Sequence, residues 1–126
     1  MGEGPAPGYQ KKPDHVVAIR PFQGRVTVKL GGETIADSRN ALLVEETGYG
    51  AVHYLPRADV RMDLAQAGDA KTYCPFKGAA SYYSFGAGGT DAANAAWSYE
   101  APYDEAAALA SYLAFYPSRV DEIAVE

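Results

Sequence analysis

The stretch RVTVKLGGETIA, residues 25–36, decides the fold class of this chain. Its first half alternates between polar and apolar side chains, which is typical of a β-strand that buries one face. Gly31 and Gly32 then form a two-residue loop, and glycine suits such loops because it adopts positive φ angles at no steric cost. The stretch therefore predicts an antiparallel hairpin whose returning strand covers residues 33–36.

Other short strands are predicted on both sides of this hairpin. They cover residues 15–19, 41–44, 52–55, 79–85, 95–99 and 123–125. Residues 57–64 fit either a strand with alternating charges or a helical turn, but the helical turn would stack like charges at i,i+4. Extended or irregular structure is therefore favoured there. Gly68 and Asp69 predict a loop.

One helix is predicted, from Asp104 to Phe115. Asp104 is a typical N-cap residue, and the alanine-rich run after it has high helix propensity. Leu109, Tyr112 and Leu113 would give this helix one apolar stripe. The fold class predicted is therefore mainly β (α+β): a compact antiparallel sheet or barrel-like β domain with one C-terminal helix.

The length of 126 residues fits one domain. Residues 1–13 are rich in proline and glycine and have almost nothing to bury, which predicts a disordered N-terminal tail. Residues 14–126 are then a single domain. The net charge of −5 disfavours binding to nucleic acid, and no apolar run reaches the roughly 20 residues of a membrane helix. A single cysteine and no secretory signal predict a soluble, cytoplasmic protein with no cofactor.

The segment TYCPFKG, residues 72–78, contains the best candidates for chemistry. Pro75 pushes the preceding Cys74 toward extended geometry at the entrance of an uncharged strand. Cys74 could act as a nucleophile, with Lys77 lowering the pKa of the thiol and His53 as the base. The competing interpretation is a buried cysteine that serves as a small apolar side chain. A metal site is disfavoured, because the chain has only two histidines.

Aromatic rings with a few polar groups suggest a small-molecule pocket. The residues proposed to line it, besides Lys77 and Cys74, are Tyr54, Arg57, Tyr83, Trp97 and Tyr99. Arg57 and Lys77 would hold an anionic group, unless either forms a structural ion pair with Glu46. Alternatively, the rings simply form the core, with their hydroxyl groups bonded to the backbone.

Several linked motifs resemble the DUF427 family, a small bacterial domain family of unknown function. They include Arg25-Val26, Ala36-Asp37-Ser38, Glu46-Thr47-Gly48, Tyr54-Leu55-Pro56-Arg57, Tyr73-Cys74-Pro75-Phe76-Lys77-Gly78, Tyr82-Tyr83, Ala96-Trp97-Ser98-Tyr99 and Leu113-Ala114-Phe115-Tyr116-Pro117. The resemblance implies a compact β-rich domain and supplies no reaction. Some members carry a nucleotidyltransferase label, which this sequence does not support because Arg61 separates Asp59 from Asp63 and opposes a magnesium ion between them.

Two functions follow from these patterns. The first is a small-ligand site, with or without catalysis. The second is a non-enzymatic interaction or assembly module, in which exposed tyrosines form a homodimer or contact a protein partner. The sequence leaves open whether the protein is an enzyme.

Overall fold

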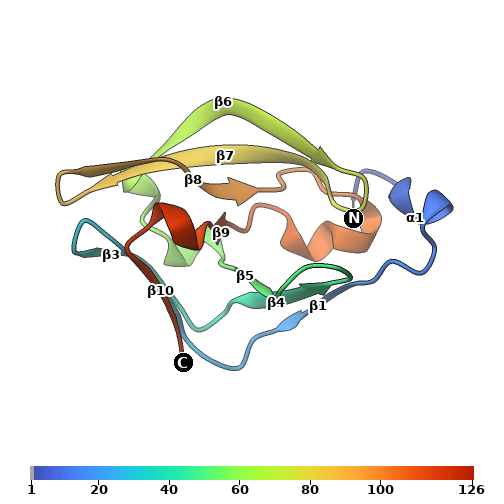
Figure 1. Ribbon diagram of the computed structural model, residues 1–126, viewed down its shortest axis with the longest axis horizontal. Coiled ribbons are helices and arrows are strands. Elements are labelled where there is room, and N and C mark those ends of the chain that lie inside the picture. Colours follow the sequence, from blue (N-terminus) through green and yellow to red (C-terminus); the bar gives the residue numbers. More distant parts are fainter. Residues whose placement is uncertain (1) are drawn as a thin grey trace.

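The computed structural model describes residues 2–126, which form three antiparallel sheets (Figure 1). The first sheet has the order β1-β4-β5, with β1 Val17–Pro21, β4 Leu42–Glu46 and β5 Val52–Tyr54. The second has the order β10-β2-β3, with β10 Glu122–Val125, β2 Val26–Leu30 and β3 Glu33–Ser38. The third has the order β6-β7-β8-β9, with β6 Ala65–Cys74, β7 Gly78–Ala87, β8 Thr90–Ser98 and β9 Ala114–Phe115. The prediction of a mainly β fold is confirmed, but the sheets do not close into a barrel.

The predicted hairpin is confirmed as β2 and β3. Gly31 and Gly32 have φ angles of +58° and +80°, so both need the freedom of glycine. Gly31 also lies against the turn between β7 and β8, where a Cβ atom on it would be 2.0 Å from the backbone oxygen of Ala87. The tips of the two hairpins thus touch and join the second sheet to the third.

The long four-stranded sheet forms one layer, and the two smaller sheets lie beneath it (Figure 1). Each small sheet has its own part of the core. One buried cluster includes Val28, Ile35 and Phe85 from the second and third sheets. The other includes Val44 and Tyr54 from the first sheet. The core between the layers is therefore built from strands of different sheets.

The prediction of one helix from Asp104 to Phe115 is wrong. Only a short 3-10 turn, η3 Asp104–Leu109, forms, and Ala106 inside it has non-helical angles. The chain then pairs as a strand: Leu113 bridges to Leu55, and β9 pairs with β8. These tertiary pairings override the helix propensity of the alanine-rich run.

Two segments differ from their predictions. Residues 57–64 form two short 3-10 turns, η1 Arg57–Asp59 and η2 Met62–Leu64, instead of the extended or irregular structure favoured there. Arg61 lies between the two turns and pairs with Asp63, so the like charges of one continuous helical turn do not arise. The loop predicted at Gly68 and Asp69 is wrong, because both residues lie within β6. The pairing of β6 with β7 shifts its register between Ala67 and Lys71, as at a β-bulge, so turn-forming residues are tolerated inside the strand.

The N-terminal segment contacts the rest of the protein. It contains a short helix, α1 Gly8–Lys11, and the side chain of Asp104 accepts hydrogen bonds from the backbone amides of Gly2 and Gly4. Asp104 thus binds this segment instead of capping a helix. The disordered tail at residues 1–13 stays a prediction, and Met1 lies outside the described residues. Within residues 2–126, no helix is long and apolar enough to cross a membrane.

Candidate functional site

A cavity of about 360 Å³, here called the central cavity, lies between the two layers. Half of its lining residues are aromatic, and the wall also contains one lysine, one glutamate and the cysteine. The residues lining it are Val44, Glu46, Tyr49, Gly50, Val52, Tyr54, Cys74, Lys77, Tyr82, Trp97, Tyr99 and Tyr116. Five of the eight predicted site residues are among them: Cys74, Lys77, Tyr54, Trp97 and Tyr99.

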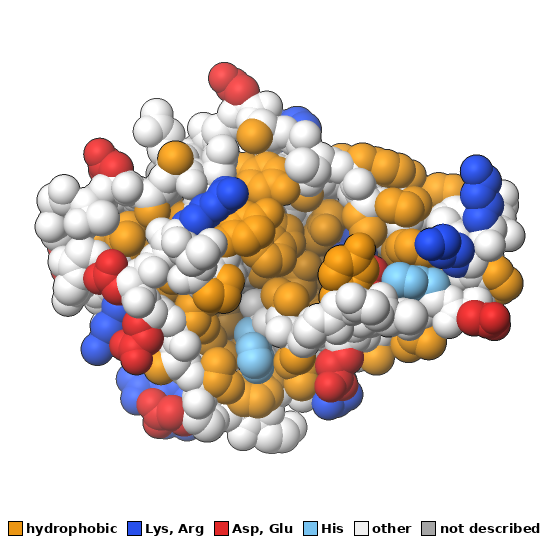
Figure 2. Space-filling model, viewed as in Figure 1, with side chains coloured by type: hydrophobic (Ala, Val, Ile, Leu, Met, Phe, Trp, Pro, Cys, Tyr) orange, Lys and Arg blue, Asp and Glu red, His pale blue; other side chains and the backbone are white. Residues whose placement is uncertain are grey.

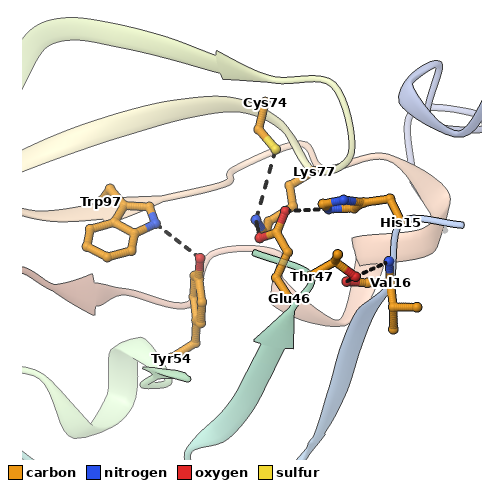
Figure 3. Close-up of polar contacts among 8 residues, drawn as sticks. All are labelled: His15, Val16, Glu46, Thr47, Tyr54, Cys74, Lys77 and Trp97. Atoms are coloured by element: carbon orange, nitrogen blue, oxygen red, sulfur yellow. Dashed lines mark hydrogen bonds and ion pairs between the residues drawn. The ribbon is translucent and has the colours of Figure 1, made fainter. Parts of the chain in front are cut away.

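The turn between β6 and β7 places Cys74 and Lys77 together. The backbone amide of Lys77 donates to the carbonyl of Cys74, and Gly78 leaves the turn with a φ of +120°, which glycine tolerates. Lys77 Nζ consequently lies 3.9 Å from Cys74 Sγ (Figure 3). Because the two residues are only three positions apart, this pairing was within reach of sequence reasoning.

Glu46, the last residue of β4, connects Lys77 to His15 (Figure 3). One carboxylate oxygen accepts a hydrogen bond from Lys77 Nζ, and the other lies 2.8 Å from His15 Nε2. The exposed fractions of the Lys77 and Glu46 side chains are only 8% and 10%. The cavity wall thus carries a buried ion pair, in which the carboxylate balances the lysine charge.

The pairing of β1 with β4 positions His15. Val17 lies opposite Glu46 in the register of these strands, and the Val16 amide donates to Thr47 Oγ1 over 2.9 Å. The His15 ring also stacks on Phe76, with 3.8 Å between the ring centroids. The imidazole is thereby fixed between the carboxylate and an aromatic face.

Three tyrosines of the wall, Tyr54, Tyr99 and Tyr116, stay uncharged at neutral pH. Burial raises the pKa of the Tyr54 and Tyr99 hydroxyls well above the ordinary value. Burial and a hydrogen bond with Tyr82 raise the pKa of Tyr116 to about 12. Trp97 Nε1 donates to Tyr54 Oη over 3.1 Å, which fixes the two rings edge to face. The rings therefore offer neutral surface beside the ion pair.

The other three predicted site residues do not line the central cavity. Arg57 donates to Tyr83 Oη over 3.1 Å and forms an ion pair with Glu100. These contacts hold Arg57 and Tyr83 in a cluster separate from the central cavity. His53 packs edge-on against Phe22, and burial lowers the pKa of its imidazole. This geometry gives no support to His53 as the base for Cys74.

His15 and the two tyrosines Tyr82 and Tyr116 were missed by sequence reasoning. Glu46 was considered only as an ion-pair partner, and its pairing with Lys77 is one of the two possibilities named. Neighbouring residues give no signal for His15, because its place depends on the register of β1 and β4. The tyrosines could have been selected only by knowing which face of each strand lines the cavity.

Two further hollows adjoin the central cavity. The first, here called the apolar cavity, has a volume of about 350 Å³ and is lined by Val26, Val28, Ala51, Val52, His53, Leu55, Trp97, Phe115, Pro117, Ile123 and Val125. It shares Val52 and Trp97 with the central cavity. The second, of about 1110 Å³, lies along the N-terminal segment and shares Glu46, Tyr49 and Cys74 with the central cavity. Figure 2 shows apolar side chains gathered over the hollowed middle of this face.

Both aspartates considered for nucleotidyl transfer have hydrogen-bond partners within the protein. Asp59 accepts a hydrogen bond from Ser38 Oγ over 2.6 Å, and both carboxylate oxygens of Asp63 bind the Arg61 guanidinium. Across residues 2–126, no three His, Cys, Asp or Glu side chains converge to form a metal site.

Residues 18–126 match the family model NTP_transf_9, described as a domain of unknown function (DUF427). No curated protein matches the chain.

Proposed function

Because this chain belongs to the DUF427 family, a domain of unknown function, we propose its function from the site alone: the central cavity binds a small neutral carbonyl compound beside Cys74. One observation carries the proposal. Lys77 Nζ lies 3.9 Å from Cys74 Sγ on the wall of an aromatic cavity, so a thiol and a hydrogen-bond donor face the same space.

The charge balance favours a neutral ligand over the anionic one expected from sequence. Among the residues lining the central cavity, the only charged side chains are Lys77 and Glu46, and they neutralise each other. An anion bound at Lys77 would face repulsion from the Glu46 carboxylate. A carbonyl oxygen needs only a donor, and the Lys77 ammonium has three hydrogens to share among its partners.

The arrangement also supports covalent chemistry at Cys74. Sγ would add to the carbonyl carbon while the electron pair of the C=O double bond moves to oxygen. Lys77 would give that oxygen a proton and regain the proton lost by the thiol, so that the net step adds S–H across C=O. Such an attack requires the thiolate, which is the nucleophilic form of cysteine.

Alkylation of Cys74 by iodoacetamide in the folded protein tests this proposal. We expect labelling without denaturant, and slower labelling in Lys77→Met, because the neighbouring cation is lost. Lys71→Met is the matched control, since Lys71 binds Ser81 on an exposed surface. The double variant Lys77→Met with Glu46→Gln removes the ion pair without leaving a buried charge, in case the single variant does not fold.

A Cys74 that reacts only after denaturant is added would contradict the proposed site. Equal labelling rates in the wild type, Lys77→Met and Lys71→Met would contradict the role of Lys77. A thermal-shift screen of small carbonyl compounds provides the binding test, because a ligand specific for the folded state raises the melting temperature.

An interaction module is the second candidate, and exposed tyrosines favour it. Tyr49 and Tyr73 are 72% and 59% exposed, which leaves large rings available to a partner or a second copy of the chain. Light scattering of the wild type and Tyr73→Ser would test a homodimer. A monomeric wild type at high concentration would argue against it.

A further inference from the structure

We infer that the ligand of the central cavity carries an apolar chain of several carbons, which extends past Trp97 into the apolar cavity. This inference rests on the proposed function, because it extends the same site. It specifies the substrate class as a neutral carbonyl compound with an aliphatic tail.

The two cavities adjoin at shared side chains. Val52 and Trp97 line both, so these two side chains form the boundary between the cavities. The hydrogen bond from Trp97 Nε1 to Tyr54 Oη uses the one polar atom of the indole, which leaves its carbon surface to contact a ligand. A molecule held at Lys77 can therefore continue along an apolar surface.

The central cavity and the apolar cavity differ in the chemistry of their walls. The central cavity contains the ion pair and the cysteine, whereas no Asp, Glu, Lys or Arg among the described residues lines the apolar cavity. Its single titratable group, His53, has its pKa lowered by burial and so favours the neutral form. The volume of about 350 Å³ is nearly that of the central cavity. One polar end and one apolar end match a ligand with a polar head and a hydrocarbon tail.

A series of methyl ketones tests this inference: butan-2-one, hexan-2-one and octan-2-one. Calorimetry measures the Kd, and the fluorescence of Trp97 gives a second readout, because Trp97 is the only tryptophan in the chain and lies where the cavities meet. We expect the Kd to fall roughly four-fold with each added methylene that is buried.

Two variants localise the tail. Ala51→Phe fills the apolar cavity from its rim, and Val125→Asp places a carboxylate there at a position that is 47% exposed. Both should reduce the affinity for octan-2-one to that for butan-2-one. Ala93→Phe is the control, because Ala93 is also an exposed alanine but lines none of the three cavities described.

A Kd that does not depend on chain length would overturn the inference and leave the central cavity as proposed. The inference would also be overturned if the Kd for Ala51→Phe and Val125→Asp fell with ketone chain length as steeply as it does for the wild type. If none of the ketones binds, the inference also fails, and labelling of Cys74 then decides separately whether the central site exists.

Discussion

Removing one partner of the buried ion pair between Lys77 and Glu46 should strongly destabilise the protein. The two side chains are 8% and 10% exposed, so Lys77→Met leaves a carboxylate in the interior with only His15 beside it. Breaking a buried pair in this way costs about 3–5 kcal/mol. At roughly 4 °C per kcal/mol for a domain of this size, the melting temperature should fall by about 12–20 °C.

The double variant Lys77→Met with Glu46→Gln should recover most of that loss. It removes both charges, and replacing a buried ion pair by neutral groups of similar volume is often close to neutral in stability. Urea unfolding of the wild type, both single variants and the double variant gives the coupling energy from a double-mutant cycle.

An exposed ion pair between β1 and β4 provides the control. Arg20 and Glu45 also form an ion pair, but their side chains are 56% and 49% exposed. Arg20→Met should therefore cost less than about 1 kcal/mol. The reasoning is refuted if Lys77→Met costs no more than Arg20→Met, or if the double variant loses as much stability as the two single variants together.

Three further predictions follow from the fold. Deleting residues 1–7 should lower the melting temperature, because the hydrogen bonds to Asp104 are lost. An unchanged melting temperature would support the disordered tail predicted from the sequence. Gly31→Ala should destabilise the protein more than Gly32→Ala in urea unfolding, because both have positive φ but only Gly31 lies against backbone atoms; equal losses would contradict this contact. Stability should decline as the pH rises from about 10 to about 12, because folding raises the pKa of Tyr116 from 10.0 to about 12 and so favours its neutral form. In alkaline unfolding, Tyr116→Phe should lose less stability over this range than the wild type. An equal loss would contradict the raised pKa of Tyr116.

Local sequence patterns predicted the fold class, whereas the features they failed to predict depend on pairing between distant segments. The β2–β3 hairpin follows from alternation and two glycines within twelve residues. The segment from Asp104 to Phe115 has equally clear local preferences for helix, yet its second part is used by the bridge of Leu113 to Leu55 and by β9. Sequence propensity cannot weigh those pairings, because the partner strands lie far away in the chain.

The same distinction separates the predicted from the missed parts of the site. Cys74 and Lys77 come from one turn, so their proximity was predictable. Glu46 and His15 come from the other layer. Glu46 precedes Lys77 by 31 residues in the chain, and His15 precedes Glu46 by another 31. Their positions require the register of β1 with β4 and the packing of that sheet beneath the long one, which neighbouring residues do not encode.

The ion pair also links the stability of the fold to the arrangement of the site. Glu46 belongs to the first sheet, whereas Lys77 lies in the turn that follows Cys74, the last residue of β6 in the third sheet. The pair therefore joins the layers at the wall of the central cavity. A variant that loses only Lys77 would consequently lose both stability and the donor that faces the ligand, and a drop in binding would have two explanations. The double variant Lys77→Met with Glu46→Leu separates them, because it removes both charges and supplies no hydrogen-bond donor in their place. If the protein is then stable and still binds ketones as the wild type does, Lys77 serves to join the layers; if it is stable and binding is lost, Lys77 serves the ligand.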